Sequence, residues 1–540
     1  MQKKWLQNNG TVVSAHPVAS AVGIDILKQG GNAADAAVAV GFALAVCLPS
    51  AGNIGGGGFM VLRWADGSYN SLDFREKAPF AAHSDMFLDS AKNVIEDLSL
   101  YHSLSAGVPG SVDGLLKIHE KYGILKLETV IQPAIDLAYK GFAITAKQAA
   151  DLNRNDALFR NQNKGKNIAF VSDTLWEEGD LLIQKELAQT LLKIKLEGRA
   201  GFYEGSVADM IVNEMTNTNG IITHNDLKEY NSVWRNVISS KYKEYTITSM
   251  APPSSGGVAL IQLMLMCEKF PISEWGWNIL ETTHLTAEAA KRVYADRAEY
   301  LGDNDFVKVP VEKLINREYN INRINALNLL QATPSSEIKA GNFESAESEE
   351  TTHYSIVDKF GNAIAITTTL NHSYGCGIVV GGGGFLLNNE MDDFSVKSGV
   401  PNSYGLLGSS ANSIEAGKRM LSSMTPTIVE KNGRLFLVLG SPGGSTIITS
   451  VYQTIMNIVE HNMSVQEAVA AKRFHHQWQP DILYYEAGAF SLETIKLLQQ
   501  MGYQLKERTP FGRVDAILIT PDTIAVGGAD PRGDDVSMWY

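Results

Sequence analysis

The sequence contains only three cysteines in 540 residues, Cys47, Cys267 and Cys376, and they lie far apart. An odd number without close spacing excludes a disulfide framework and a cysteine-based zinc site. Cys376 is surrounded by glycines, which leaves a reactive thiol open as an interpretation. We favour the interpretation that Cys376 is an unpaired small residue without a chemical role.

Long hydrophobic runs and an excess of positive charge are also absent. The longest apolar run, Ala36 to Leu48, is too short to cross a bilayer and predicts a buried helix instead. The formal net charge of −13 disfavours a nucleic-acid partner. The first ten residues, MQKKWLQNNG, contain no apolar stretch typical of a signal peptide, so we expect either a cytoplasmic protein or a mature form whose leader has been removed.

Several familiar catalytic motifs do not occur. We find no G-x-S-x-G elbow, no H-E-x-x-H helix and no Walker loop. His475 and His476 are adjacent, so their side chains point in different directions, and structural roles are favoured over a metal site. We therefore expect neither a metal nor a cofactor.

The chain changes character near residue 350. Helical periodicity dominates from about 110 to 340, with predicted helices at Val112 to Tyr122, Leu187 to Leu196 and Thr283 to Leu301. The acidic segment GNFESAESEE follows at 341–350 and is typical of a loop. Beyond it, paired strand patterns predict hairpins around Gly361, Gly433 and Asp522, with helices at Thr446 to Val459 and Leu492 to Met501.

Thr351 follows that acidic segment directly, in the sequence TTHYS. Taken alone, the pentapeptide is typical of the start of a β-strand. The alternative is a masked N-terminal nucleophile. Cleavage between Glu350 and Thr351 would free an α-amino group, and this amine would serve as the base for the threonine hydroxyl. The same hydroxyl is able to attack the Glu350 carbonyl and make the cut.

The sequence GSPGGS at 440–445 lies between an apolar strand and a helix. A tight turn that allows close packing is one interpretation. The other is an anion-binding turn, because backbone N–H groups at glycines and at a helix N-terminus point outward. No phosphate-loop lysine follows, so an oxyanion hole for acyl transfer is the better hypothesis.

Three further places suggest ligand recognition. Arg75 lies next to a predicted strand end, Ser422 and Ser423 precede a buried strand, and the acidic Glu390 and Asp393 follow a glycine run. An arginine with serines suits a carboxylate, and two carboxylates suit an ammonium group. Together they would recognise a zwitterionic α-amino acid, although each signal alone is weak.

These residues resemble the γ-glutamyltransferase family of N-terminal nucleophile hydrolases. Ordered blocks along nearly the whole chain carry the resemblance: GGNAADAAVAV (30–40), GNIGGGGFM (52–60), DFREKAP (73–79), GVPGSV (107–112), PPSSGG (252–257), YADRAEYLGDNDFVKVP (294–310), TTHYS (351–355), LLNNEMDDFS (386–395), LSSMTPT (421–427), GSPGGS (440–445) and ADPR (529–532). The segment RTPFGRVDAI near the C-terminus matches the family only loosely.

The resemblance implies an α+β fold, a four-layer αββα sandwich made from two subunits that arise by self-cleavage. Residues 1–350 would form the large subunit and residues 351–540 the small one, and the two would remain together as a heterodimer. The reaction expected is transfer of a γ-glutamyl group from glutathione or a related compound to water or to an amino acid or dipeptide. No cofactor, no membrane span and a periplasmic or secreted location go with it.

The resemblance also assigns roles to single residues. Thr351 would be the nucleophile, Thr369 would contact its amino group, and Gly443 and Gly444 would form the oxyanion hole. The γ-glutamyl carboxylate would be held by Arg75, Ser422 and Ser423, and its amino group by Asn371, Glu390 and Asp393. Tyr404 would lie in a lid over the pocket.

Two alternatives stay open. Relatives act on poly-γ-glutamate or on cephalosporin side chains, although a lid around Tyr404 favours a small substrate. The second alternative is an inactive, uncleaved protein that binds glutamate-like ligands. The presence of all four expected catalytic residues argues against it: Thr351, Thr369, Gly443 and Gly444.

Overall fold

The computed structural model describes residues 4–341, 352–396 and 410–540. Three of the residues singled out above, Glu350, Thr351 and Tyr404, lie outside the described residues.

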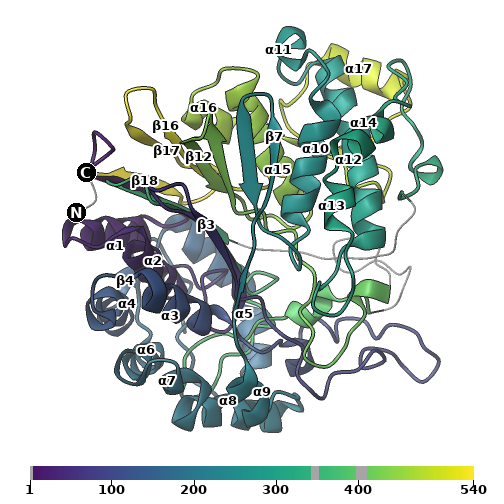
Figure 1. Cartoon of the computed structure of the whole chain (residues 1–540). Coiled ribbons are helices and arrows are strands. Elements are labelled where there is room, and N and C mark those ends of the chain that lie inside the picture. Colours follow the sequence, from purple (N-terminus) through teal and green to yellow (C-terminus); the bar gives the residue numbers. More distant parts are fainter. Residues whose placement is uncertain (1–3, 342–351, 397–409) are drawn as a thin grey trace.

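A seven-stranded sheet forms one half of the core (Figure 1). All of its strand pairs are antiparallel. In spatial order the strands are β18 (Val536–Trp539), β1 (Gly10–Ser14), β9 (Thr352–Asp358), β10 (Ala363–Thr369), β2 (Gly57–Arg63), β3 (Tyr69–Asp73) and β6 (Val233–Arg235).

A six-stranded antiparallel sheet forms the other half. Its order is β17 (Ala525–Gly528), β16 (Asp515–Ile519), β12 (Arg434–Gly440), β11 (Thr427–Lys431), β8 (Tyr245–Ser249) and β7 (Ile238–Tyr242). Strands β9 and β10 of the first sheet contact β12 and β16 of the second, so the two sheets pack face to face.

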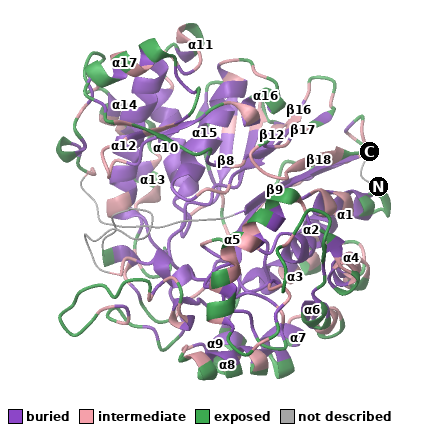
Figure 2. Ribbon diagram, turned by 180° about the vertical axis from the view of Figure 1, so that it is seen from behind, coloured by how far each residue is buried: buried purple, intermediate pink, exposed green. Residues whose placement is uncertain are grey.

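Helices cover both outer faces. The first sheet is covered by α1 (Pro17–Lys28), α2 (Ala33–Cys47) and α3 (Ser111–Tyr122), and the second by α10 (Gly256–Cys267), α15 (Thr446–Val459) and α16 (Val465–Ala470). Figure 2 shows the strands and the helices against them as mostly buried, with exposed residues on the outermost helices. The predicted αββα sandwich is confirmed.

Other helices extend the two outer layers. They are α4 (Leu127–Lys140), α5 (Ala146–Gln162), α6 (Lys185–Glu197), α7 (Ala200–Tyr203), α8 (Gly205–Thr218), α9 (His224–Glu229), α11 (Ile272–Trp275), α12 (Leu280–Tyr300), α13 (Val311–Leu314), α14 (Arg317–Ile324) and α17 (Leu492–Gln500). Short strands β4 (Phe142–Ala143), β5 (Leu181–Leu182), β13 (Phe474–His475), β14 (Leu483–Glu486) and β15 (Leu505–Arg508) form two small sheets.

The buried helix α2 shows how the sequence specifies an element. Its residues are all buried, so the apolar run predicted at Ala36 to Leu48 is confirmed as a core helix. Asn32 caps it by accepting from the backbone N–H groups of Ala34 and Asp35, and the Asp35 carboxylate accepts in return from the Asn32 N–H. This reciprocal capping satisfies N–H groups that would otherwise be orphaned in the core.

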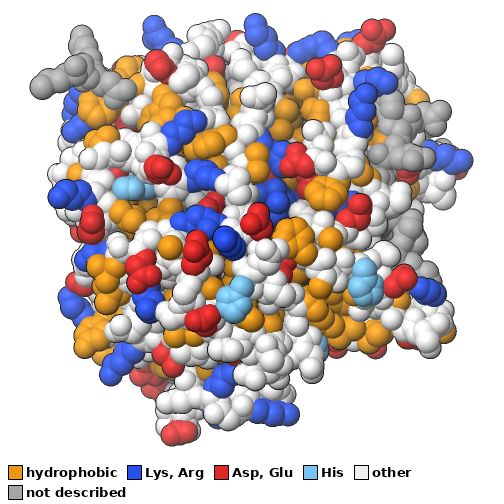
Figure 3. All heavy atoms as spheres, turned by 60° about the horizontal axis from the view of Figure 1, so that its bottom comes forward, with side chains coloured by type: hydrophobic (Ala, Val, Ile, Leu, Met, Phe, Trp, Pro, Cys, Tyr) orange, Lys and Arg blue, Asp and Glu red, His pale blue; other side chains and the backbone are white. Residues whose placement is uncertain are grey.

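The predicted hairpins are present as well. Strands β9 and β10 pair around Gly361, β11 and β12 around Gly433, and β16 and β17 around Asp522. No helix among the described residues is long and apolar enough to cross a membrane. Charged side chains of both signs are interspersed over the face in Figure 3, as their scattered distribution in the sequence predicts.

Candidate active site

Arg75 lies at the centre of the candidate site, two residues beyond the end of strand β3, and is fully buried. Its backbone is fixed on both sides: its N–H donates to Asp73 Oδ1 at 3.0 Å, and its carbonyl accepts from Tyr230 Oη at 2.8 Å. The guanidinium donates to the carbonyls of Met420 at 3.3 Å and Leu421 at 3.1 Å. The guanidinium is therefore bound to the two residues that precede Ser422 and Ser423 in the sequence.

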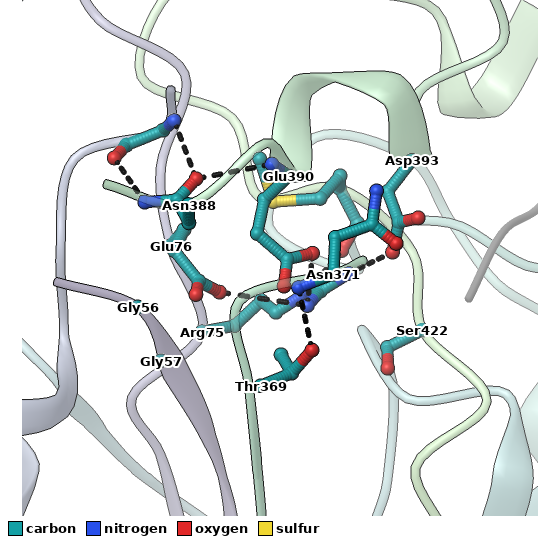
Figure 4. Close-up of polar contacts among 12 residues, drawn as sticks. Gly56, Gly57, Arg75, Glu76, Thr369, Asn371, Asn388, Glu390, Asp393 and Ser422 are labelled. Carbon is teal, nitrogen blue, oxygen red and sulfur yellow. Dashed lines mark hydrogen bonds and ion pairs between the residues drawn. The ribbon is translucent and has the colours of Figure 1, made fainter. Parts of the chain in front are cut away.

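Three carboxylates surround this guanidinium (Figure 4). Glu390 Oε2 is 2.5 Å from Nη1, Asp393 Oδ2 pairs with Nη2, and Glu76 Oε2 is 3.5 Å from Nη1. Burial alone would lower the pKa of Arg75, but the charges of Glu390, Asp393 and Glu76 raise it above its ordinary value. The arginine expected to bind a carboxylate and the acids expected to bind an ammonium thus form one cluster.

Two carboxylates of this cluster, those of Glu76 and Glu390, hold protons more tightly than in water. Burial, opposed by the charge of Arg75, raises the pKa of Glu76 to about 8. The same two influences leave the pKa of Glu390 well above its ordinary value. A single cation faces three acids in a dry site, so the cluster retains a proton at neutral pH.

Thr369 ends strand β10 beside the cluster and is fully buried. Its Oγ1 accepts from the Asn371 N–H at 2.7 Å, which shapes the turn that follows the strand. Asn371 has a left-handed φ of 70° and donates through Nδ2 to the Asn389 carbonyl at 3.0 Å. Its buried Oδ1 accepts no hydrogen bond from any other described residue, so it remains able to accept one from a ligand.

Ser422 and Ser423 are buried in the segment that runs past Arg75. The Ser422 carbonyl accepts from the Ser255 N–H at 2.6 Å, and Ser422 Oγ accepts from the Met424 N–H at 3.2 Å. Ser423 Oγ accepts from Arg297, whose Nε also donates to Ser255 Oγ at 2.8 Å. The serines are therefore fixed from the side of α10 and α12.

Gly443 and Gly444 form the turn between β12 and α15, and both have positive φ, 125° and 61°. Their carbonyls accept from the N–H groups at the start of α15, those of Thr446 and Ile447. Neither glycine N–H donates a hydrogen bond to any described residue. Two unused N–H donors at a helix N-terminus are the arrangement that an oxyanion hole requires.

Strand β9 begins at Thr352, the residue after the expected nucleophile, and Thr352 is fully buried. Its register partner is Thr368, one residue before Thr369. His353 packs against Gly440 at the end of β12, where a side chain on the glycine would lie 2.4 Å from the imidazole. Burial lowers the pKa of His353 to about 3, so this histidine is neutral.

Sequence reasoning missed several residues that support the site. Glu76 lies in the Arg75 cluster, and Arg297 holds Ser423. Asn388 bridges two loops, because Nδ2 donates to the carbonyls of Gly55 and Gly107, each at 2.8 Å. All three occur in the motifs quoted above, but a motif alone does not tell a supporting side chain from one that binds a ligand.

The other candidates have structural roles. His475 is buried between Thr449 Oγ1 at 2.8 Å and Gln477 Oε1 at 3.0 Å, and His476 faces Asp481 at 3.2 Å. Cys376 is buried, and burial raises the pKa of its thiol to about 12. Within the described ranges, no group of three or more His, Cys, Asp or Glu side chains is arranged to hold a metal ion.

Comparison with known proteins identifies the family. The sequence profile described as Gamma-glutamyltranspeptidase matches residues 19–540. The chain belongs to the γ-glutamyltranspeptidase family. It is 46% identical over 533 residues to the glutathione hydrolase proenzyme of Escherichia coli (strain K12), covering 98% of this chain and 92% of that one. It is 34% identical over 548 residues to the acylase ACY 1 proenzyme of Pseudomonas sp. (strain V22), covering 98% of this chain and 93% of that one.

Solved structures agree with this membership. The cephalosporin acylase of Bacillus halodurans superposes with a TM-score of 0.86 at 25% identity, covering 100% of this chain and 97% of that one. The γ-glutamyltranspeptidase of Helicobacter pylori matches with a TM-score of 0.60 at 45% identity, covering 63% of this chain and 97% of the matched chain. The family resemblance expected from the motifs is confirmed.

Proposed function

We propose that this chain is an autoprocessing γ-glutamyltransferase and glutathione hydrolase that uses Thr351 as its nucleophile. The observation that carries the proposal is the placement of the Arg75 cluster beside the end of β10, where the register partner of Thr352 also lies. The glutathione hydrolase proenzyme of Escherichia coli, 46% identical over nearly the whole chain, supports the same activity.

The buried cluster suits the γ-glutamyl group because it offers charges of both signs. The substrate carboxylate would bind Arg75 with the hydroxyls of Ser422 and Ser423. The substrate ammonium would bind Glu390, Asp393 and the open Oδ1 of Asn371. Substrate binding then exchanges the internal ion pairs of Arg75 for pairs with the ligand, which limits the desolvation cost of either charge.

Catalysis would proceed through an ester. Thr351 Oγ attacks the γ-carbonyl carbon while its α-amino group takes the hydroxyl proton, and Gly443 and Gly444 donate N–H groups to the oxyanion. The C–N bond then breaks, and the proton passes from the amino group to the leaving amine. Water, an amino acid or a dipeptide attacks the γ-glutamyl ester and frees Thr351.

The same hydroxyl would first make the chain competent by proteolytic self-cleavage. Attack of Thr351 Oγ on the Glu350 carbonyl gives an ester, and its hydrolysis leaves residues 1–350 and 351–540 as separate chains. The cut frees the amino group on which every later step depends. Thr369, at the end of β10, would position that amino group.

A direct test compares the wild type with Thr351→Ala. We expect the wild type to release p-nitroaniline from γ-glutamyl-p-nitroanilide, and the variant to remain one chain and to release none. Thr352→Ala is the matched control, since it removes the neighbouring threonine hydroxyl. Full activity in Thr351→Ala would contradict the proposal.

A second substrate class has support of its own, because a cephalosporin acylase superposes over the full chain and an acylase proenzyme is 34% identical. The buried cation and acids of the Arg75 cluster favour a zwitterionic γ-glutamyl group over an uncharged acyl chain. Parallel assays with glutathione, glutaryl-cephalosporin and polyglutamate separate the candidates. A higher kcat/KM for glutathione is the expected result.

The family resemblance also supports a periplasmic or secreted location. Fractionation of cells that produce the protein from its native gene, followed by assay of each fraction, tests this part of the proposal.

A further inference from the structure

A cavity of about 500 Å³ opens beside Pro442 and Gly443, on the turn proposed as the oxyanion hole. The segment 508–513 forms one wall, and the loop 48–51 with helix α5 forms another. Ser373 and Tyr374, a few residues beyond Thr369, complete the lining. Its volume is typical of a pocket for a small ligand, and no role assigned above uses it.

The wall formed by 508–513 is fixed to the oxyanion turn. The Arg513 N–H donates to Ser441 Oγ at 3.1 Å, and Gly512 lies 3.2 Å from the position of a β-carbon on Gly443. From behind, Arg473 donates to the carbonyls of Phe511 and Gly512, each at 3.1 Å. The cavity therefore keeps a constant position relative to the Gly443 N–H.

Most charges in the cavity are already matched. Lys147 and Arg154 both pair with Asp151, at 3.2 and 2.8 Å. Asp534 accepts from Thr145 Oγ1 at 2.7 Å, and Arg513 faces Asp535 at 3.5 Å.

Arg508 is different. Its guanidinium lies over the rings of Phe511, at 4.9 Å, and Tyr484, at 5.6 Å. No carboxylate of the described residues lies within ion-pair distance of it. These cation–π contacts hold the guanidinium without using its N–H groups, which remain able to donate to an external partner.

We infer that this cavity binds the amino acid or peptide part that leaves the substrate, and the acceptor that replaces it, through a carboxylate held by Arg508. The inference rests on the proposed function. The γ-glutamyl part would lie towards Arg75, and the departing amine would lie on the opposite side of the carbonyl group whose oxygen Gly443 binds. Cysteinylglycine and every free amino acid or peptide acceptor carry a carboxylate, which a guanidinium binds through two parallel hydrogen bonds.

The transfer step then follows with balanced atoms. The acceptor amine, held by its carboxylate on Arg508, attacks the ester carbon of the γ-glutamyl enzyme. The new C–N bond forms, the C–O bond to Thr351 breaks, and the amine proton passes to Thr351 Oγ. Water competes for the same ester when the cavity holds no acceptor.

The test compares glycylglycine with glycylglycinamide as acceptors, with γ-glutamyl-p-nitroanilide as donor. The amide lacks the carboxylate and otherwise has the same shape. We expect the wild type to prefer glycylglycine, and Arg508→Gln to lose about tenfold or more of that preference in kcat/KM. Arg508→Lys should fall between the two, because it keeps the charge but not the planar fork.

Arg154→Gln is the control, since it removes a cation of the same cavity that is already paired with Asp151. It should retain the preference for glycylglycine. Equal losses for both acceptors in Arg508→Gln, or loss of preference in Arg154→Gln, would overturn the assignment of Arg508. A wild type that releases no p-nitroaniline would overturn the proposed function, and the inference with it.

Discussion

At the residue scale, Arg75 shows why a site requires an arginine rather than any positively charged side chain. Its guanidinium uses several donors at once, on the carbonyls of Met420 and Leu421 and on the carboxylates of Glu390 and Asp393. A lysine would keep the charge, but its compact ammonium group is unable to reach these acceptors together. The geometry of the guanidinium therefore matters as much as its charge.

We predict that Arg75→Lys lowers kcat/KM for γ-glutamyl-p-nitroanilide by about 100-fold or more, because two charge-assisted hydrogen bonds are lost. Arg63→Lys is a suitable control, since Arg63 is also buried and pairs with Glu430 at 2.6 Å away from the cluster. Steady-state kinetics checks both variants. An Arg75→Lys enzyme with wild-type kcat/KM would refute the assignment.

A second residue-scale prediction concerns the buried acids Asp515 and Asp535. Burial is the main cause that raises the pKa of Asp535, to about 6, and burial together with the Asp535 charge raises the pKa of Asp515 well above its ordinary value. Arg513, Asp530 and Asp534 also face the pair. The folded protein thus binds protons here that the unfolded chain has released, so stability falls as pH rises from about 4 through about 6.

We expect this loss of unfolding free energy to be about 3 kcal/mol for Asp535. Asp535→Asn should flatten the decline, whereas Asp534→Asn, which changes the neighbouring carboxylate, should keep it. Thermal unfolding of the three proteins across this pH range gives the answer. An unchanged slope in Asp535→Asn would contradict the account.

At the scale of elements, the capping of α2 is the clearest local device. Asn32 accepts from two N–H groups and donates through Nδ2 to the Tyr122 carbonyl at 2.7 Å. We predict that Asn32→Ala lowers the free energy of unfolding by about 1–2 kcal/mol. Asn32→Asp should lose less, because it keeps the capping oxygen. Denaturant unfolding measures the free energy of unfolding of both variants. Equal losses in Asn32→Ala and Asn32→Asp would argue against capping as the cause.

The glycine run before β2 matters because of close backbone contacts. A β-carbon on Gly56 would lie 2.0 Å from the Thr369 carbonyl oxygen, whereas one on Gly381 would meet nothing closer than 3.6 Å. We expect Gly56→Ala to cost about 1–3 kcal/mol of stability and to lower activity by displacing Thr369. Gly381→Ala should do neither. Thermal unfolding and p-nitroaniline release test the pair.

Much of this fold follows from the sequence, for physical reasons. Alternating strands around Gly361 and Gly433 and the apolar run of α2 are local patterns, and the structure confirms them. The pairing of Arg75 with Glu390 and Asp393 is not local, because these residues are more than 300 positions apart. The motifs predict which residues belong to the site, whereas the ion pairs between these residues are known only from the folded structure.

The supporting role of segment 508–513 was also beyond the sequence. That stretch matches the family loosely and carries no motif, yet it lies against Gly443 through Gly512. The contact depends on β12, α15 and β16 packing together, which no local pattern specifies.

At the scale of the whole molecule, the proposed cut would divide both sheets. Strands β9, β10 and β18 lie after residue 351, and in the sheet β1 lies between β18 and β9 while β10 pairs with β2. The second sheet likewise joins β11 to β8. The two pieces would therefore share one core rather than meet as separate domains.

We accordingly predict that the cleaved pieces elute together in size-exclusion chromatography and separate only in denaturant. The reason is the large apolar area buried between the shared strands and the helices that cover them. Two peaks without denaturant would contradict this account.

The cut before Thr351 is the central claim, since the freed amino group is the proposed base for every step. N-terminal sequencing of the purified protein tests it most directly. We predict two chains, of which the smaller begins TTHYS. One active chain with an intact bond between Glu350 and Thr351 would contradict the account.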